Sequence, residues 1–310
     1  MQHMAKTQLS EYIANDLKKQ KGISVPVRAS LLERLLIKNA PCSKLHPNAE
    51  DEFSMESVGP SYEIINEYEK SFREAMWMEK RVFGEPLLVE KLRPDGFLLL
   101  NGHHRWAAAM RCQIKKVPIK IINCATESDI RKLLERSRHD KRVAIDLDEV
   151  VFRPSDYEYL EKKANTFPMS LRFNKRIRLG IPALFYYLSK NGYDIWLYAS
   201  DYYSIDDVRK FFRAYSARVD GIITGYGKRQ NKTESEIQME KLIFNKYSTT
   251  LHIDNDLVIE THCNTKEFEE YEINSSEEDW SRKVIAIVEE IEKRADKNRT
   301  GKDAGIVRSR

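Results

Sequence analysis

RVAIDLDEVV, residues 142–151, determines how the second half of the chain is interpreted. The short apolar run 143–145 predicts a buried strand, and Asp146 and Asp148 follow it at once. Ligands of open α/β sheets bind beyond the carboxyl ends of the strands. Two carboxylates at the end of a buried strand therefore indicate a binding edge.

Two later strands also end in polar residues. DIWLYAS, residues 194–200, places Ser200 at the end of one strand, and TLHIDND, residues 250–256, places Asp254 and Asp256 at the end of another. A further strand is expected at 221–224, and helices at 182–190, 205–215, 234–247 and 279–294. This alternation predicts a parallel sheet with helices on both faces.

The polar strand ends suit phosphoryl transfer. Asp146 offers an ionised oxygen that can attack phosphorus, and Asp148 can protonate the leaving oxygen and then activate water. The charge on the phosphoryl oxygens calls for hydrogen-bond donors and cations, which Ser200 and Lys232 can supply. Lys232 is favoured because it directly precedes a capping-box sequence, TESE, and so stands at a helix N-terminus. Lys228 and Lys241 remain alternatives.

The same edge gathers the acidic side chains that a divalent cation needs. Carboxylates packed together repel one another unless a cation lies among them, and Mg²⁺ prefers oxygen ligands. Asp146, Asp254, Asp256 and the backbone carbonyl of Asp148 are the expected ligands. Glu260 is an alternative to Asp256.

The motif D-x-D-x-[TV]-[LVI], here residues 146–151, resembles the first motif of the haloacid-dehalogenase superfamily. The resemblance covers residues 142–260 and assigns all four motifs of that family in order. It implies a Rossmannoid parallel sheet and a Mg²⁺-dependent phosphatase that forms an aspartyl-phosphate on Asp146. The implied substrate is a small phosphorylated metabolite or nucleotide. The stretch between the first strand and the helix at 182 has room for a flap but not for a full cap domain.

A second pattern lies in the first half of the chain. Short strands are expected at 87–90, 97–100 and 117–122, with a helix at 106–112. NGHHR, residues 101–105, joins a strand to the N-terminus of that helix. Backbone N–H groups there favour anions, Gly102 permits close approach, and Arg105 can bind phosphate oxygens with two donors. These features indicate a nucleotide or phosphate site.

This pattern resembles the ParB/sulfiredoxin fold over residues 23–124, which implies a smaller α+β domain that binds a nucleotide such as ATP or ADP. The resemblance assigns Asn101, Gly102, His103, His104 and Arg105 to the nucleotide. Sulfiredoxins have their catalytic cysteine where this chain has His103, so sulfiredoxin activity is excluded. Free-serine kinases of the same fold have a catalytic aspartate where this chain has Asn101.

The histidines and the preceding acidic segment allow two interpretations each. The pair His103 and His104 either serves the nucleotide or is a hydrogen-bonded structural feature. The irregular segment 44–65 carries Glu50, Asp51 and Glu52 and is expected to be a solvated loop. Its alternative role is to supply an acidic group or a lid to the nucleotide loop.

Composition limits the remaining possibilities. The 310 residues are 41% hydrophobic and 32% charged, with a formal net charge of +4, so a dedicated nucleic-acid protein is not expected. No apolar run reaches the ~18 residues that span a bilayer, so no membrane partner is expected. The four cysteines lack CxxC spacing, which indicates reduced thiols and a cytoplasmic protein.

The expected organisation is a helical extension at 1–22, a ParB/sulfiredoxin-like domain at 23–138, a haloacid-dehalogenase-like domain at 139–296 and a flexible tail at 297–310. The leading functional hypothesis is a Mg²⁺-dependent phosphatase with a nucleotide-binding domain. One alternative is an ATP- or ADP-dependent kinase of small molecules, carried by the first domain. The other is a module that grips nucleic acid under nucleotide control.

Overall fold

The protein forms two compact units, each described by itself. A computed structural model describes residues 6–154, 156–162, 175–226, 233–263, 265 and 267–306. The first unit comprises Met1–Ala125 together with Ser200–Asp206 and Thr224–Ile237. The second comprises Thr126–Ala199, Asp207–Ile223 and Gln238–Arg310. The charged helix at 127–136, which was expected to close the first domain, belongs to the second unit.

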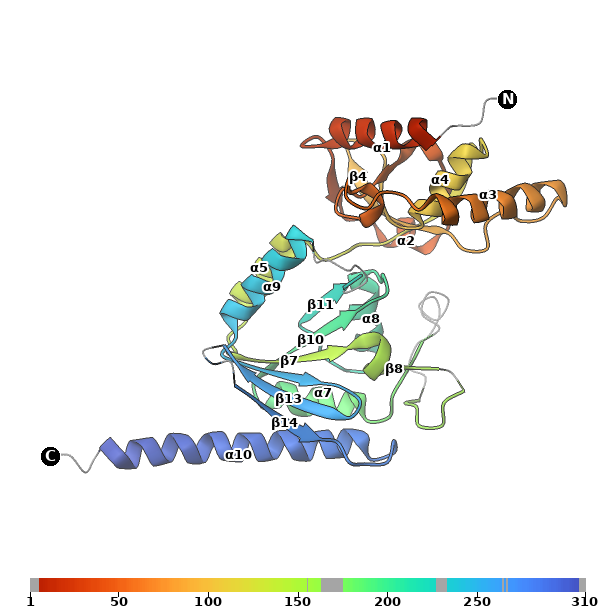
Figure 1. Ribbon diagram of the computed structural model, residues 1–310. Coiled ribbons are helices and arrows are strands. Elements are labelled where there is room, and N and C mark those ends of the chain that lie inside the picture. Colours follow the sequence, from red (N-terminus) through yellow and green to blue (C-terminus); the bar gives the residue numbers. More distant parts are fainter. Residues whose placement is uncertain are drawn as a thin grey trace. The chain divides into compact units, whose positions relative to one another are not determined.

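The first unit is a mixed sheet packed with helices (Figure 1). Its strands run in the order β2-β6-β4-β5-β3, and β1 pairs with β4. The β6–β4 and β5–β3 pairs are parallel, whereas β2–β6, β4–β5 and β1–β4 are antiparallel. In chain order the elements are α1 (Lys6–Gln20), β1 (Val25–Val27), α2 (Leu31–Leu35), β2 (Lys38–Pro41), η1 (Cys42–Lys44), β3 (Leu45–Pro47), η2 (Glu52–Ser54), α3 (Tyr62–Trp77), β4 (Leu87–Arg93), β5 (Phe97–Asn101), α4 (His103–Arg111) and β6 (Lys116–Ile121).

The core of the first unit is fixed around α4. Ala107, Ala108 and Ala109 are fully buried, and their small side chains let the helix approach its neighbours closely. Trp106 is also fully buried, and its indole N–H donates to the carbonyl of Cys42 at 3.1 Å. A buried indole N–H without a partner would cost free energy, so this bond fixes the orientation of the ring.

The expectation of a solvated loop at 44–65 is wrong. Leu45 is fully buried in β3 and Phe53 is 2% exposed in η2, so apolar side chains anchor this acidic segment to the core. Phe53 packs against the rings of both His103 and His104. Single apolar anchors among polar residues have no periodicity, and for that reason the sequence pattern does not reveal them.

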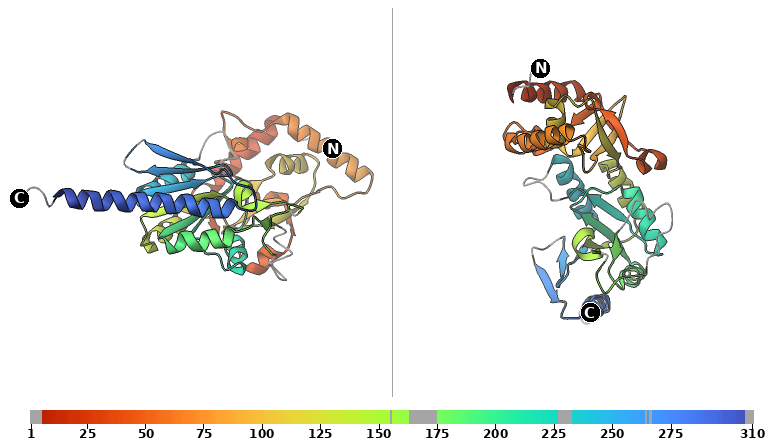
Figure 2. Two further views of the ribbon diagram at one scale, coloured as in Figure 1. Left: turned by 90° about the horizontal axis from the view of Figure 1, so that it is seen from below. Right: turned by 90° about the vertical axis from the view of Figure 1, so that its right-hand side faces the viewer.

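The second unit is a sheet of order β11-β10-β7-β12-β13-β14, with a two-stranded sheet β8–β9 beside it (Figures 1 and 2). Its elements are α5 (Glu127–Arg136), β7 (Lys141–Asp146), the π-helical turn η3 (Leu147–Val151), β8 (Phe152–Arg153), β9 (Arg176–Ile177), α7 (Ile181–Lys190), β10 (Tyr193–Ala199), α8 (Ile205–Ala214), β11 (Gly221–Thr224), α9 (Glu234–Lys246), β12 (Thr249–Ile253), β13 (Leu257–His262), β14 (Phe268–Glu272) and α10 (Trp280–Ile306).

The centre of this sheet is parallel, as the sequence predicts. Strand β7 lies between β10 and β12, and both neighbours run parallel to it. The rings of Phe185 in α7 and Phe212 stack at 5.6 Å, so α7 and the following helix share one face of the sheet. The crossover from β11 to β12 runs in the opposite direction along the sheet, and the right-handed rule places α9 on the other face.

The antiparallel hairpin β13–β14 and the length of helix α10 were not expected. Strands β13 and β14 extend the sheet by antiparallel pairing after Asp256. Helix α10 continues to Ile306, into the segment that was expected to be a tail (Figure 2).

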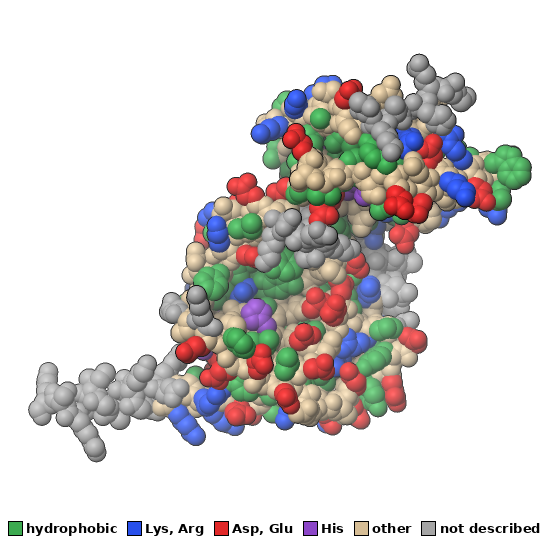
Figure 3. All heavy atoms as spheres, viewed as in Figure 1, with side chains coloured by type: hydrophobic (Ala, Val, Ile, Leu, Met, Phe, Trp, Pro, Cys, Tyr) green, Lys and Arg blue, Asp and Glu red, His purple; other side chains and the backbone are tan. Residues whose placement is uncertain are grey.

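The edge strand β14 has the strongly acidic sequence FEEYE, and charge on an edge strand opposes pairing with other chains. Figure 3 shows acidic side chains spread over this part of the unit.

No helix of the described ranges is both long and apolar enough to cross a membrane.

Replacing Gly221 with Ala should destabilise the second unit. A Cβ at this position would lie 2.2 Å from the ring of Trp196, which is 1% exposed and cannot move without disturbing the core. Overpacking of this kind costs about 1–3 kcal/mol, measurable as a lower midpoint of denaturant unfolding. Gly84→Ala is the control, because an added Cβ there meets nothing within 4 Å. Equal stability of the two variants would contradict this account of the packing.

Candidate functional site

A left-handed glycine builds the candidate nucleotide site of the first unit. Gly102 follows β5 and is the N-cap of α4, with φ of 96°. A Cβ there would lie 2.5 Å from Leu87 Cδ2 and 3.0 Å from Arg105 Nη2. Both the backbone conformation and the close approach of these side chains require glycine. The turn therefore brings the N-terminus of α4 and the Arg105 guanidinium to one place.

Arg105 lies back over this turn instead of extending into solvent. Its Nη1 donates to the carbonyl of Glu85 at 3.1 Å, and the atoms nearest to Gly102 are its Nη2 and Nε. A planar guanidinium held in this way can present its other donors to an anion without a large loss of side-chain entropy. The helix N-terminus adds a positive dipole end at the same point.

His103 and His104 hold the acidic segment 44–65 by accepting hydrogen bonds from its backbone. The backbone N–H of Asn48 donates to His103 Nε2 at 3.3 Å, and that of Ser61 donates to His104 Nε2 at 3.1 Å. A ring nitrogen that accepts a hydrogen bond carries no proton, so these bonds favour the neutral imidazoles protonated on Nδ1. The interpretation of the pair as a hydrogen-bonded structural feature fits this geometry.

The segment 44–65, held by these hydrogen bonds, brings carboxylates to the nucleotide loop. His103 is 4% exposed, and its Nδ1 lies 3.6 Å from Asp51 Oδ2. Asp51 and Glu52 line the same cavity as Gly102 and Arg105. The alternative role for this segment, an acidic group beside the nucleotide loop, is therefore the one the geometry supports. Two carboxylates beside an arginine suit a ligand that carries both negative charge and a bound cation.

The cavity has a volume of about 670 Å³ and a lining of mixed character. Its polar lining residues include Asn101 and Arg105, next to Gly102. Its aromatic lining residues include Tyr68, Phe72 and Phe83, and the two phenylalanine rings lie 4.7 Å apart. A cavity of this size that combines polar and aromatic residues suits a phosphorylated ligand that also carries a flat ring.

Two backbone hydrogen bonds orient the carboxylate of Asp146 in the second unit. It is the last residue of β7, and its Oδ1 accepts the backbone N–H groups of Asp148 and Glu149, both at 2.7 Å. Burial raises the pKa of Asp146 despite these two bonds, which lower it. The π-helical turn supplies both N–H groups, and turns of this kind are frequent at functional sites. The turn thus fixes the orientation of the carboxylate.

Strand register brings Asp254 to the same edge. Ile253 of β12 lies opposite Ile145 of β7, so Asp254 and Asp146 leave neighbouring strands side by side. On the other side of β7, Tyr198 of β10 lies opposite Asp146. Strands β10, β7 and β12 are therefore neighbours, whereas the expected convergence of Asp146, Ser200 and Asp254 on one cation and one phosphate stays a prediction.

An unpredicted cluster organises this edge. Asn255 Oδ1 accepts bonds from Arg153 Nη2 at 2.6 Å and Arg178 Nη1 at 3.1 Å, and its Nδ2 donates to the carbonyl of Glu149. Arg178 is 1% exposed, with its guanidinium 3.9 Å from the ring of Trp280. Asn255 therefore ties the loop after β12 to the turn after β7. The sequence shows Asn255 only as the spacer between two aspartates and gives no signal for the arginines.

The other predicted residues lie as follows. Asp148 is part of the π-helical turn, and Asp256 is exposed beyond β12. Ser200 directly follows β10 and belongs to the first unit. Lys232 and its alternative Lys228 lie outside the described residues, and Lys241 is exposed on α9. The expected capping box is confirmed, because Thr233 and Glu236 exchange hydrogen bonds of 2.7 and 3.1 Å.

The magnesium site stays a prediction. Among the residues whose placement is described, no group of three or more His, Cys, Asp or Glu side chains is arranged to hold a metal ion. The alternative ligand Glu260 is wrong, because β13 runs back along β12 and places Glu260 opposite Leu251, away from the strand end. Asp146, Asp254 and the carbonyl of Asp148 remain as oxygen donors at the edge.

Residues 36–137 match the family model of the ParB N-terminal domain. This confirms the ParB-like part of the resemblance, whereas the haloacid-dehalogenase resemblance of the second unit lies outside the match and stays a prediction. No curated protein is detectably similar to the chain.

Among solved structures, the chain is similar to the C-terminally truncated chromosome-partitioning protein ParB from Caulobacter crescentus complexed with CTP-γ-S. The identity is 22% and the TM-score 0.23, over 34% of this chain and 56% of that one. The matched region thus spans little more than half of that protein, and a TM-score of this size supports no argument about ligand or function.

Acid should weaken the first unit through His104. Burial lowers the pKa of His104, and Asp51 only partly offsets this. Because the folded state holds its proton less tightly than the unfolded chain, His104 contributes stability above pH ~6.5 that is lost as the pH falls through the folded pKa. Denaturant unfolding between pH 7.5 and 5 should show wild type losing stability more steeply than His104→Gln, which can accept the Ser61 bond but does not titrate. Parallel pH profiles would rule this out.

Proposed function

We propose that the first unit binds a nucleoside di- or triphosphate, with ATP and ADP among the candidates, in the cavity built on Gly102 and Arg105. The observation that carries this proposal is the left-handed turn that joins a helix N-terminus to an anchored guanidinium in the lining of the cavity. The match of residues 36–137 to the ParB N-terminal domain supports it. The aromatic residues of the lining offer contacts for the nucleoside.

The phosphates would meet three kinds of group. The N-terminus of α4 and Arg105 supply hydrogen-bond donors and positive charge. Asp51 and Glu52 would repel bare phosphates, so we expect the nucleotide to bind with a divalent cation such as Mg²⁺. Asn101, at the end of β5, is a neutral residue beside the glycine and adds no charge to this balance.

Gly102→Ala should abolish nucleotide binding. The added methyl group would collide with Leu87 and Arg105 and would strain the positive φ, so the turn must change. Isothermal titration with MgATP and MgCTP should detect binding to wild type and at least a tenfold loss for this variant. Gly22→Ala is the matched control, because it has a φ of 74° but nothing within 4 Å of an added Cβ. If both variants bind as wild type does, the site is elsewhere.

A second candidate function, phosphoryl transfer by the second unit, is favoured by one observation. Asp146 ends a central parallel strand, is oriented by two backbone N–H groups and lies beside Asp254 on the neighbouring strand. Asp146 would be the nucleophile and Asp148 the acid/base. The oxygen donors present suit Mg²⁺, which would neutralise the approaching phosphate. A small phosphorylated compound is the proposed substrate.

Asp146→Asn should remove Mg²⁺-dependent hydrolysis of p-nitrophenyl phosphate, because an amide is too weak a nucleophile to form the acyl phosphate. A loss of at least about a hundredfold in kcat is expected, and EDTA should have the same effect on wild type. Asp279→Asn removes an exposed carboxylate from the same unit and should keep full activity. An equal Mg²⁺-dependent rate in wild type and Asp146→Asn would end the assignment.

The nucleotide site is also compatible with two alternative functions, a kinase and a nucleic-acid-binding module. A kinase would transfer labelled phosphate from ATP to a small hydroxyl compound, and the transfer would survive Asp146→Asn. Asp51, Glu52 and Glu85 are the carboxylate residues that line the cavity, and position 101 holds an asparagine. A nucleic-acid module would instead show binding that falls steeply with salt.

A further inference from the structure

The first unit includes a segment from the second half of the sequence. Residues Ser200–Asp206 follow directly after β10, yet they belong to the compact unit formed by Met1–Ala125. Within that unit, Tyr202 lines the same cavity as Gly102 and Arg105. The candidate nucleotide site therefore includes a side chain that lies outside the ParB-like match at 36–137.

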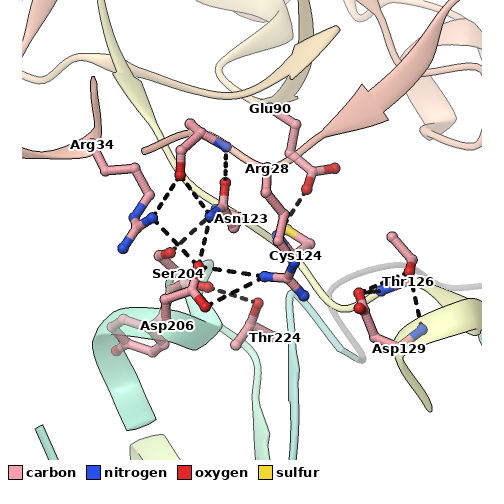
Figure 4. A network of polar contacts seen from close by, with 12 residues as sticks. Arg28, Arg34, Glu90, Asn123, Cys124, Thr126, Asp129, Ser204, Asp206 and Thr224 are labelled. Atoms are coloured by element: carbon pink, nitrogen blue, oxygen red, sulfur yellow. Dashed lines mark hydrogen bonds and ion pairs between the residues drawn. The ribbon is translucent and has the colours of Figure 1, made fainter. Parts of the chain in front are cut away.

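Asn123 holds this segment in place through backbone and side chain (Figure 4). Its N–H donates to Ser204 Oγ at 3.3 Å, and its carbonyl accepts the N–H of Ile205 at 3.0 Å. Its Nδ2 donates to Asp206 Oδ2 at 2.7 Å and to the carbonyl of Ala29 at 3.1 Å. Asn123 is 2% exposed, so these bonds are shielded from water and each would be costly to lose.

Two arginines add charge to this anchor. Arg28 Nη1 lies 3.4 Å from both carboxylate oxygens of Asp206, and Arg34 Nη1 lies 3.4 Å from its Oδ2 (Figure 4). Arg34 is 6% exposed and also donates to the carbonyl of Ala29 at 2.7 Å. Without Asp206, the buried guanidinium of Arg34 would lose an ion-pair partner. The end of the segment is thus fixed in the first unit.

The ring of Tyr202 packs against the backbone of Gly225. A Cβ on Gly225 would lie 2.2 Å from Tyr202 Cε1, so the ring packs directly on the backbone there. Gly225 has φ of 73°, and its N–H donates to the carbonyl of Asp201 at 3.1 Å. Thr224 Oγ1 donates to the carbonyl of Tyr203 at 3.0 Å. These contacts fix the position of the Tyr202 ring at the cavity wall.

We propose that Tyr202 packs against the nucleoside part of the ligand and so completes the nucleotide site. This inference rests on the proposed nucleotide-binding function of the first unit. Phosphates are attracted by Arg105 and the helix N-terminus, and an uncharged aromatic ring adds little to that attraction. A ring held rigidly at a cavity wall instead offers a face for a base to stack on.

The test compares a nucleotide with its phosphate part alone in the full-length protein. MgATP, MgCTP and magnesium tripolyphosphate are titrated calorimetrically into wild type, Tyr202→Ala, Tyr202→Trp and Arg105→Ala. Tyr202→Ala should weaken nucleotide binding at least about fivefold, as expected for loss of one stacking contact, and leave tripolyphosphate unchanged. Tyr202→Trp should retain nucleotide affinity. Arg105→Ala should weaken both ligands.

Tyr203→Ala is the matched control, since Tyr203 is the next residue in the same anchored segment and does not line the cavity. It should bind both ligands as wild type does. Unchanged nucleotide affinity in Tyr202→Ala, with both ligands weakened in Arg105→Ala, would overturn this inference and leave the proposed function standing. Equal loss of both ligands in Tyr202→Ala would also overturn it, because the ring would then only support the segment. No nucleotide binding by wild type would overturn the proposed function itself.

Discussion

The first unit depends on the absence of one methyl group at position 102. Leu87 and Arg105 both occupy the space where a Cβ would stand, and the backbone there is left-handed. That turn directs α4 so that its N-terminus, its first-turn histidines and Arg105 all reach the same cavity. The histidines then fix the segment 48–61 by accepting backbone N–H groups, and Phe53 packs on both rings. The acidic side chains of that segment have their position because of the same turn.

The two units present an anionic ligand with opposite electrostatics. The first offers a helix N-terminus and a guanidinium, which attract phosphate directly, while its carboxylates lie to one side. The second offers mainly carboxylates, among them Asp146 and Asp254 at neighbouring strand ends, and ionised carboxylates repel a phosphate unless a cation lies between them. The buried Arg178 and the partly buried Arg153 both donate to Asn255 and position the loop. A bound divalent cation stays a prediction at both candidate sites.

The sequence predicts what is local and misses what depends on a distant partner. Strand β11 has the predicted bounds, and β7 ends at Asp146 as expected, because short apolar runs between turn signals are local features. The hairpin β13–β14 was missed, since β13 is held by pairing with β12 and the acidic FEEYE of β14 by pairing with β13. Of the candidate site residues, the sequence predicts the strand-end aspartates and Gly102. Phe53, Asn255 and Tyr202 were not, because each acts through contacts with segments remote in sequence, and no spacing pattern encodes such contacts.

The anchor at Asn123 bears on which part of the chain forms the first site. The ParB-like match ends at residue 137, and a domain defined by sequence alone would include Asn123, Arg28 and Arg34 but not Asp206. In such a fragment the buried Arg34 would lose its ion pair with Asp206, and the buried amide of Asn123 would lose its bond to the same carboxylate. Removing a partner of a buried polar group is costly. The physical unit that holds the cavity is therefore larger than the matched segment. It extends to residues that also continue from the end of β10, so the two candidate functions share covalent structure even though their chemistry is different.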